Sequence, residues 1–179
     1  MEIDIIKNQF IELYNKEANG IFRFCILRVS DKEVATDLTQ DIFMRYWDYI
    51  LKNENKEVVS SRALLFKIAR NSIIDWYRKK KNLSLETLTE TDDESFNREG
   101  VLLRDPSSNT IEIQAEAKIF IKKIEEIDIT YREEVYLRFV EDLNPKEIAE
   151  ITQKSVNVVS VHINRGLNQL RKLLDIYEK

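Results

Sequence analysis

Apolar residues recur at spacings of three and four along almost the whole chain. The segment from Ile42 to Ile50 is typical, with Phe43, Tyr46 and Trp47 between its ends. This is the period of an amphipathic helix, and no segment alternates cleanly at the period of two that a half-buried strand requires. Only three glycines and two prolines are present in 179 residues, too few for the tight turns of a β-sandwich or barrel. The sequence therefore predicts an all-α fold.

The periodic segments predict eight helices. They span residues 3–18, 20–29, 31–52, 61–81, 110–127, 130–142, 145–152 and 157–176. Some ends carry their own signals: Ser30 or Asp31 can cap the third helix, and Asn144 followed by Pro145 supplies a cap and a first-turn proline for the seventh.

The periodicity fails between Leu83 and Asn109, where the composition turns polar and acidic and contains Gly100 and Pro106. This segment predicts a flexible linker, residues 83–109, between two small helical domains, residues 1–82 and 110–179. A flexible coil of this length spans about 30 Å on average, so we expect the two domains to be able to reach separate sites.

The lone cysteine, Cys25, has no partner for an internal disulfide and lies beside apolar residues, which predicts a buried thiol in a reducing compartment. The first residues lack the pattern of a signal peptide, and no run approaches the roughly 20 apolar residues of a membrane span. We therefore expect a cytoplasmic protein. The sequence has no glycine-rich phosphate loop and no Cys/His cluster, so no cofactor or metal is expected.

The net charge of −4 at first argues against a nucleic-acid partner, but the charge is unevenly distributed. Residues 62–81 hold seven basic residues and one acid, a net charge of +6, and residues 153–172 hold four basic residues and no acid. Residues 84–116 hold nine acids and two arginines, a net charge of −7. An acidic chain thus carries one basic helix in each domain, and two such helices favour nucleic-acid binding over a merely solvated surface.

Aromatic residues interleave with the first basic helix. Phe66, Trp76 and Tyr77 could stack on the bases of single-stranded nucleic acid, or they could pack in the core. The sequence leaves both roles open, and core packing is favoured for Trp76 and Tyr77.

The second basic helix follows a short capped helix that carries the small residue Ala149, an arrangement typical of a helix-turn-helix. On the second helix, the spacing points five residues toward the core: Val158, Val159, Ile163, Leu167 and Leu170. It leaves Ser160, Asn164, Arg165 and Asn168 facing outward for base edges, while Lys154, Arg171 and Lys172 suit phosphates. His162 is either a contact or an ordinary surface residue, and the latter is favoured.

These residues together resemble the bacterial sigma-70 family, specifically the small two-domain extracytoplasmic-function (ECF) type. The resemblance rests on three motifs in the right order. They are Asp37-Leu38-Thr39-Gln40-Asp41-Ile42-Phe43 with Trp47, Phe66-Lys67-Ile68-Ala69-Arg70-Asn71 with Asp75 and Arg78, and Glu147-Ile148-Ala149 followed by Arg165-Gly166-Leu167.

The resemblance implies a role for each domain. The first would dock on core RNA polymerase, at the β′ clamp helices, through Asp37, Gln40 and Asp41, and would open the −10 element. The second would contact the β flap and bind the −35 element as duplex DNA. The −10 candidates are Phe66, Lys67, Arg70, Asn71 and Arg78. The −35 candidates are Lys154, Asn157, Ser160, Asn164, Arg165, Asn168 and Arg171. An anti-sigma factor, often at the inner membrane, is also implied.

The chain departs from the family pattern at four positions. Leu64 stands where an aromatic is common, Val158 and Val161 stand where Thr and Ser are usual, and Gly166 replaces the usual Ala.

The sequence thus predicts a transcription initiation factor that is not an enzyme and has no small-molecule substrate. Two other interpretations remain. One is a helix-turn-helix regulator whose N-terminal domain only dimerises, and the other is a nuclease that would bind metal through Asp92, Asp93 and Glu94. Promoter melting would follow if the first domain binds the opened strand better than duplex DNA.

Overall fold

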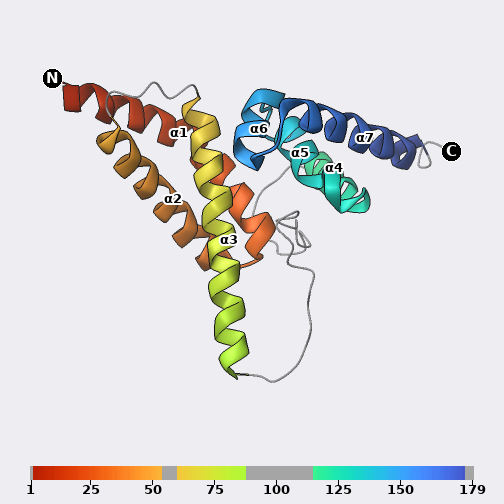
Figure 1. Cartoon of the computed structure of the whole chain (residues 1–179), viewed down its shortest axis with the longest axis horizontal. Helices are drawn as coiled ribbons and strands as arrows, with labels where there is room; N and C mark the ends of the chain where they lie inside the picture. The colour runs from red at the N-terminus through yellow and green to blue at the C-terminus, as the bar shows by residue number, and fades with distance from the viewer. Residues whose placement is uncertain (1, 54–59, 88–114, 176–179) are drawn as a thin grey trace.

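The computed structural model of the protein describes residues 2–53, 60–87 and 115–175. All regular elements in these ranges are helices, which confirms the all-α prediction. They are α1 (Glu2–Val29), α2 (Lys32–Lys52), α3 (Ser61–Thr87), α4 (Ala115–Glu126), α5 (Ile129–Phe139), α6 (Pro145–Thr152) and α7 (Val156–Asp175). We refer to α1–α3 as the N-terminal domain and to α4–α7 as the C-terminal domain (Figure 1).

The first helix corrects the prediction of two helices, 3–18 and 20–29, because α1 continues through Gly20. A glycine inside a helix costs roughly 1 kcal/mol relative to alanine. The residues that follow it, Ile21, Phe24 and Cys25, are fully buried, and this burial outweighs the local penalty. A Cβ atom at Gly20 would lie 3.2 Å from Glu141 Oε2, so the position is also tightly packed.

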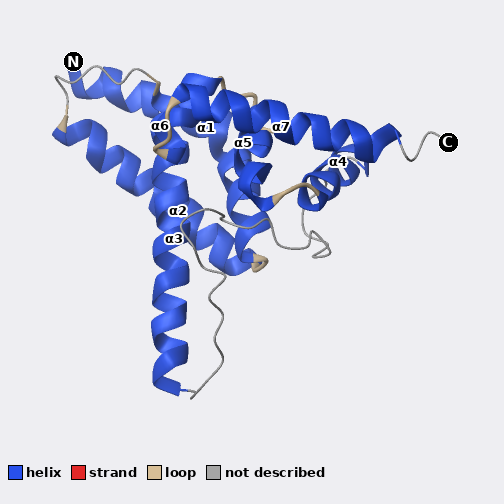
Figure 2. Ribbon diagram, turned by 45° about the vertical axis from the view of Figure 1, so that its right-hand side comes forward, coloured by secondary structure: helices blue, strands red, loops and turns tan. Residues whose placement is uncertain are grey.

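Helix α3 is longer than the predicted helix 61–81. It continues to Thr87 rather than residue 81, so residues 83–87 of the predicted linker are helical. Residues 88–109 of that linker, with the acidic cluster Asp92, Asp93 and Glu94, lie outside the described residues, as do 110–114 of the fifth predicted helix. In both views the C-terminal end of α3 extends beyond the other helices (Figures 1 and 2).

The N-terminal domain packs α1, α2 and α3 around an apolar core. Asp31 caps α2 by accepting a hydrogen bond from the Val34 backbone N–H, one of the two caps predicted. Cys25 is fully buried, as predicted, and burial raises the pKa of its thiol to about 12. Tyr77 is buried and donates a hydrogen bond to the Arg28 carbonyl, so its role is in the core.

The C-terminal domain contains the predicted helix-turn-helix, formed by α6 and α7. Asn144 and Glu147 form a capping box at the start of α6, with Pro145 in the first turn. Gln153, with φ of 58°, ends the helix in a left-handed conformation. Gly166 lets α7 approach α5 closely, because a Cβ atom there would lie 2.5 Å from Val135 Cγ2.

The two domains pack against each other, with α3 lying beside α6 (Figures 1 and 2). The apolar part of the contact joins the rings of Phe24 and Tyr136, whose centroids are 6.0 Å apart. The Arg28 guanidinium lies over both rings, 3.5 Å from the Phe24 centroid and 4.9 Å from that of Tyr136. The buried residues of both domains therefore form one continuous core.

Candidate nucleic-acid and polymerase interfaces

The outer face of α7 carries most of the predicted −35 residues. Val159, Ile163 and Leu170 are buried against the C-terminal domain, which fixes the orientation of the helix. The opposite face is exposed, and it gathers Asn157, Asn164, Arg165, Asn168 and Arg171. Ser160 is half-buried at the side of this face. Val158, predicted to face the core, is instead exposed, because it lies on the far side of the helix from Ile163.

Lys154, the remaining −35 candidate, is part-buried rather than free on the surface. Its Nζ lies 2.6 Å from Oε1 of Glu134, a fully buried carboxylate of α5. The same oxygen is 3.2 Å from Nδ1 of His162, which is half-buried at the side of α7. Lys154 thus neutralises a buried carboxylate of the C-terminal domain that His162 also contacts, and any phosphate contact by Lys154 competes with its pairing to Glu134.

The predicted −10 residues on α3 are divided between buried and exposed positions. Phe66 is fully buried and packs edge-to-face on Phe24, so it cannot stack on a base in this arrangement. Arg70 is only 8% exposed, and its Nε donates to Glu133 Oε1 at 3.0 Å. Lys67 is half-buried, whereas Asn71 and Arg78 are exposed.

The far end of α3 is open and basic. Arg78 is exposed and lies 3.7 Å from Asp75, a weak surface pair. The exposed Lys80 places its Nζ 5.0 Å from the ring centroid of the half-buried Trp76. Residues 79–81 are exposed lysines, and their charges are available to phosphates in this arrangement of the domains.

The predicted polymerase-docking residues lie along one exposed face of α2. Asp37, Gln40 and Asp41 are exposed, and helical spacing places Met44 on the same face, 66% exposed. Gln40 and Met44 border an apolar groove between α1 and α2 of about 590 Å³. Its other lining residues are Lys7, Phe10, Ile11, Tyr14, Phe43, Trp47 and Asp48. Acidic residues beside an apolar groove fit an amphipathic, basic protein helix better than they fit DNA.

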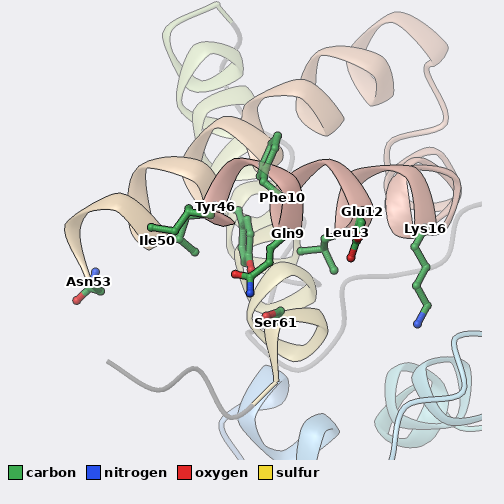
Figure 3. A pocket seen from close by; sticks show the side chains of 10 residues that line it. Gln9, Phe10, Glu12, Leu13, Lys16, Tyr46, Ile50, Asn53 and Ser61 are labelled. Carbon is green, nitrogen blue, oxygen red and sulfur yellow. The ribbon is translucent and has the colours of Figure 1, made fainter. Parts of the chain in front are cut away.

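A second pocket of about 500 Å³ lies where α1, the end of α2 and the start of α3 meet. Figure 3 shows Tyr46 and Ile50 from α2 and Phe10 and Leu13 from α1 around it, with polar Gln9 at its edge. Asn53 and Ser61, which lie on either side of the loop between α2 and α3, also line the pocket. Residues 54–59 of that loop lie outside the described residues.

Comparison with known protein families identifies both domains. Residues 13–83 match the family model of sigma-70 region 2, and residues 118–170 match that of sigma-70 region 4. The chain is 30% identical over 173 residues to the ECF RNA polymerase sigma factor SigM of Bacillus subtilis (strain 168), covering 88% of this chain and 96% of SigM. The chain belongs to the ECF sigma factors of the sigma-70 family.

Further comparisons agree with this assignment. The ECF RNA polymerase sigma factor SigX of Bacillus subtilis (strain 168) is 26% identical over 172 residues, covering 96% of this chain and 86% of SigX. Among solved structures, the sigma factor RpoE of Bartonella quintana, crystallised with the anti-sigma factor NepR, superposes with a TM-score of 0.62 at 21% identity, covering 94% and 98% of the two chains. This likeness shows the shared two-domain helical fold.

The family assignment makes this sigma factor a transcription initiation factor that directs RNA polymerase to promoters. It disfavours the regulator with a dimerising N-terminal domain, because residues 13–83 match a sigma region instead. Among the described helices none is long and apolar enough to cross a membrane.

Sequence analysis of this sigma factor missed the residues that join its two domains. Glu141 accepts hydrogen bonds from Arg23 Nε at 3.1 Å and Nη2 at 3.0 Å, and another from the Tyr136 hydroxyl at 2.7 Å. Ser60 donates to Glu147 at 2.7 Å, which ties the start of α3 to α6. No local pattern marks the Arg23–Glu141 and Ser60–Glu147 pairs, because the two partners in each pair come from distant parts of the chain.

The electrostatics of this contact follow from burial. Burial alone would lower the pKa of Arg23, but the interactions with Glu141 and Tyr136 together outweigh it, and the pKa is raised above its usual value. Burial, with the charge of Glu141, raises the pKa of Tyr136. Arg28 is fully buried, and burial lowers its pKa; its Nε and Nη2 have no hydrogen-bond partner among the described residues. The domain contact therefore includes both paired charges and one costly unpaired cation.

Proposed function

We propose that this sigma factor docks on core RNA polymerase through α2, captures the melted −10 strand with α3 and binds the −35 duplex with α7. The observation that carries the proposal is the placement of the candidate residues. Asn157, Asn164, Arg165, Asn168 and Arg171 share the exposed side of the second helix of a helix-turn-helix, the element that enters the major groove in such motifs.

The proposed docking surface is the acidic face of α2 with its adjoining groove. Asp37, Gln40 and Asp41 would contact basic residues of the β′ clamp helices, and the apolar groove beside Met44 would take apolar side chains from the same helices. The C-terminal domain would contact the β flap.

The proposed −10 function of α3 rests on its exposed cations and on differential affinity. Asn71 and Arg78 are exposed for a strand, while Arg70 would exchange Glu133 for a phosphate. If the domain binds the opened strand better than duplex DNA, binding shifts the equilibrium toward the melted promoter. Bond formation belongs to the polymerase, so the sigma factor itself would have no catalytic activity.

An anti-sigma factor is the other proposed partner. It would cover the polymerase-binding surfaces in the cytoplasm and, where it is a membrane protein, would hold the sigma factor at the inner membrane. Co-purification from the native host tests both partners, because polymerase and inhibitor would each be identified from the same sample.

In vitro transcription with core polymerase tests the proposal as a whole. The reconstituted holoenzyme should initiate from a cognate promoter, and Asp37→Arg with Asp41→Arg should abolish co-elution with core polymerase. Asn19→Arg is the control, because it adds positive charge at an exposed position of α1 that does not line the groove. Co-elution that survives the double reversal would overturn the docking assignment, and an absence of added initiation would overturn the function.

A further inference from the structure

Two valines stand exposed on the face of α7 that carries the polar −35 candidates. Val158 is 41% exposed and Val161 is 45% exposed. They are three residues apart and therefore neighbours on the helix surface. The core of the C-terminal domain does not use them, since Val159, Ile163 and Leu170 fill that role.

The two valines lie between the polar −35 candidates on the surface of α7, not to one side of them. Val161 follows Asn157 by four residues and precedes Asn164 by three and Arg165 by four, so helical geometry places it next to all three. Val158 and Arg165 are two turns apart on the same side. Any surface that the asparagines and Arg165 contact must also meet the two valines.

A DNA duplex offers one apolar group in its major groove, the 5-methyl of thymine. The γ-methyl groups of valine cannot hydrogen-bond to the polar base edges. Packing against the thymine 5-methyl group, in contrast, removes apolar surface of both groups from water and favours binding. The surrounding charge favours a polyanion such as DNA over a basic or neutral protein surface, because residues 153–172 carry four cations and no acid.

We propose that Val158 and Val161 are specificity-determining residues that recognise thymine in the −35 element through its 5-methyl group. This inference rests on the proposed function of α7 as the −35-binding helix. It adds an apolar, base-selecting contact to a face on which the other residues hydrogen-bond or bind phosphate.

The test removes the methyl groups from each side in turn. The reconstituted holoenzyme first selects promoters from a library with a randomised −35 region. Each thymine of the selected element, on either strand, is then replaced by deoxyuridine, which lacks only the 5-methyl group. Open-complex formation is measured for the wild type and for Val158→Ser with Val161→Ser, which removes every γ-methyl group at two exposed positions. Val156→Ser is the matched control, because Val156 is also 40% exposed but lies two turns before Ile163, toward the core side.

We expect deoxyuridine at one or two −35 positions to weaken the wild type about fourfold each, the effect of losing one buried methyl group. The double serine variant should be insensitive to the same replacement, while Val156→Ser should respond like the wild type. Tolerance of deoxyuridine at every −35 thymine, absence of selected thymines, or equal sensitivity of the wild type and the double variant would each overturn the inference. Failure of the underlying function has a different signature: Arg165→Ala would then leave the dependence on the −35 element unchanged.

Discussion

The two candidate DNA-binding helices differ in how much of their binding face is already occupied. On α7 the polar and basic candidates from Asn157 to Arg171 are mostly exposed. On α3 the candidates are divided: Phe66 is in the core, Arg70 is buried against Glu133, and only Asn71 and Arg78 are exposed. Both helices are strongly basic, so sequence charge alone does not distinguish them.

The difference arises because the C-terminal domain itself covers part of α3. Glu133 and Glu141 belong to this domain, and they hold Arg70 and Arg23 of the N-terminal domain. Contact of Arg70 with a DNA strand requires this ion pair to open, whereas α7 needs no such change. This arrangement therefore leaves the candidate −35 face exposed and the candidate −10 face partly covered.

The largest expected effect comes from Glu141→Gln, which removes the charge at the centre of the domain contact. Arg23 would keep only hydrogen bonds to a neutral amide oxygen, and we expect the contact to lose about 2 kcal/mol. The measurement is fluorescence energy transfer between dyes on Thr36→Cys and Lys172→Cys, both at exposed positions. Cys25 is fully buried and should remain unlabelled in the folded protein. We expect a larger dye separation in the variant.

Glu134→Gln is the control for this experiment. Glu134 is also fully buried, but its partners Lys154 and His162 lie in its own domain. We expect it to lower the stability of the C-terminal domain without changing the dye separation. Equal separation in the wild type and Glu141→Gln would show that this ion pair does not hold the domains together.

The next effect concerns Arg70 alone. Glu133→Gln removes its charged partner, so less free energy is lost when Arg70 turns to a phosphate. We expect the free sigma factor to bind the non-template strand of a cognate −10 element up to about tenfold more tightly, measured by fluorescence anisotropy at fixed salt. Adding Arg70→Ala should cancel the gain. A gain that persists in the double variant would assign the effect to domain opening in general.

Local patterns in the sequence predicted most of the fold correctly. Helices form where apolar residues recur at helical spacing, and the caps at Asp31 and Asn144 depend on neighbouring residues only. The single α1 was missed because the penalty at Gly20 is local, while the burial that overrides it is tertiary. The helix-turn-helix was predicted from spacing and is confirmed.

The candidate sites were less predictable, because exposure depends on what packs against each helix. Phe66 between basic residues is compatible with stacking or with the core, and only the position of Phe24 decides between them. The prediction that Val158 faces the core is wrong, because apolar residues at helical spacing are expected to face the core and Val158 is apolar and five residues before the buried Ile163. In the structure Val159 faces the core and Val158 is exposed. The partners of Arg70 and Arg23 lie more than 60 residues away, and no local pattern pairs them.

A smaller effect on stability is expected at Gly166, where α7 packs closely against α5. In Gly166→Ala the new Cβ would lie 2.5 Å from Cγ2 of the buried Val135 and 3.1 Å from the Tyr131 Cβ. Overpacking of this kind costs about 1–3 kcal/mol, and the better helix propensity of alanine returns at most about 1 kcal/mol. We expect a net loss of about 1 kcal/mol in urea unfolding. The loss should shrink when Val135→Ala makes room, and an unchanged loss in that background would contradict the steric explanation.

The smallest effect is expected at Asp75, which pairs with Arg78 on the open end of α3. Both side chains are about half exposed and their charged atoms are 3.7 Å apart, so water already solvates each charge. Asp75→Asn should change the free energy of unfolding by less than about 0.5 kcal/mol and leave the dye separation unchanged. Asp75 and Glu133 each pair with an arginine of α3, and the two pairs differ chiefly in how deeply they are buried. If Asp75→Asn improved strand binding as much as Glu133→Gln, removal of any nearby negative charge would explain both results, and the partly covered −10 face would lose its support.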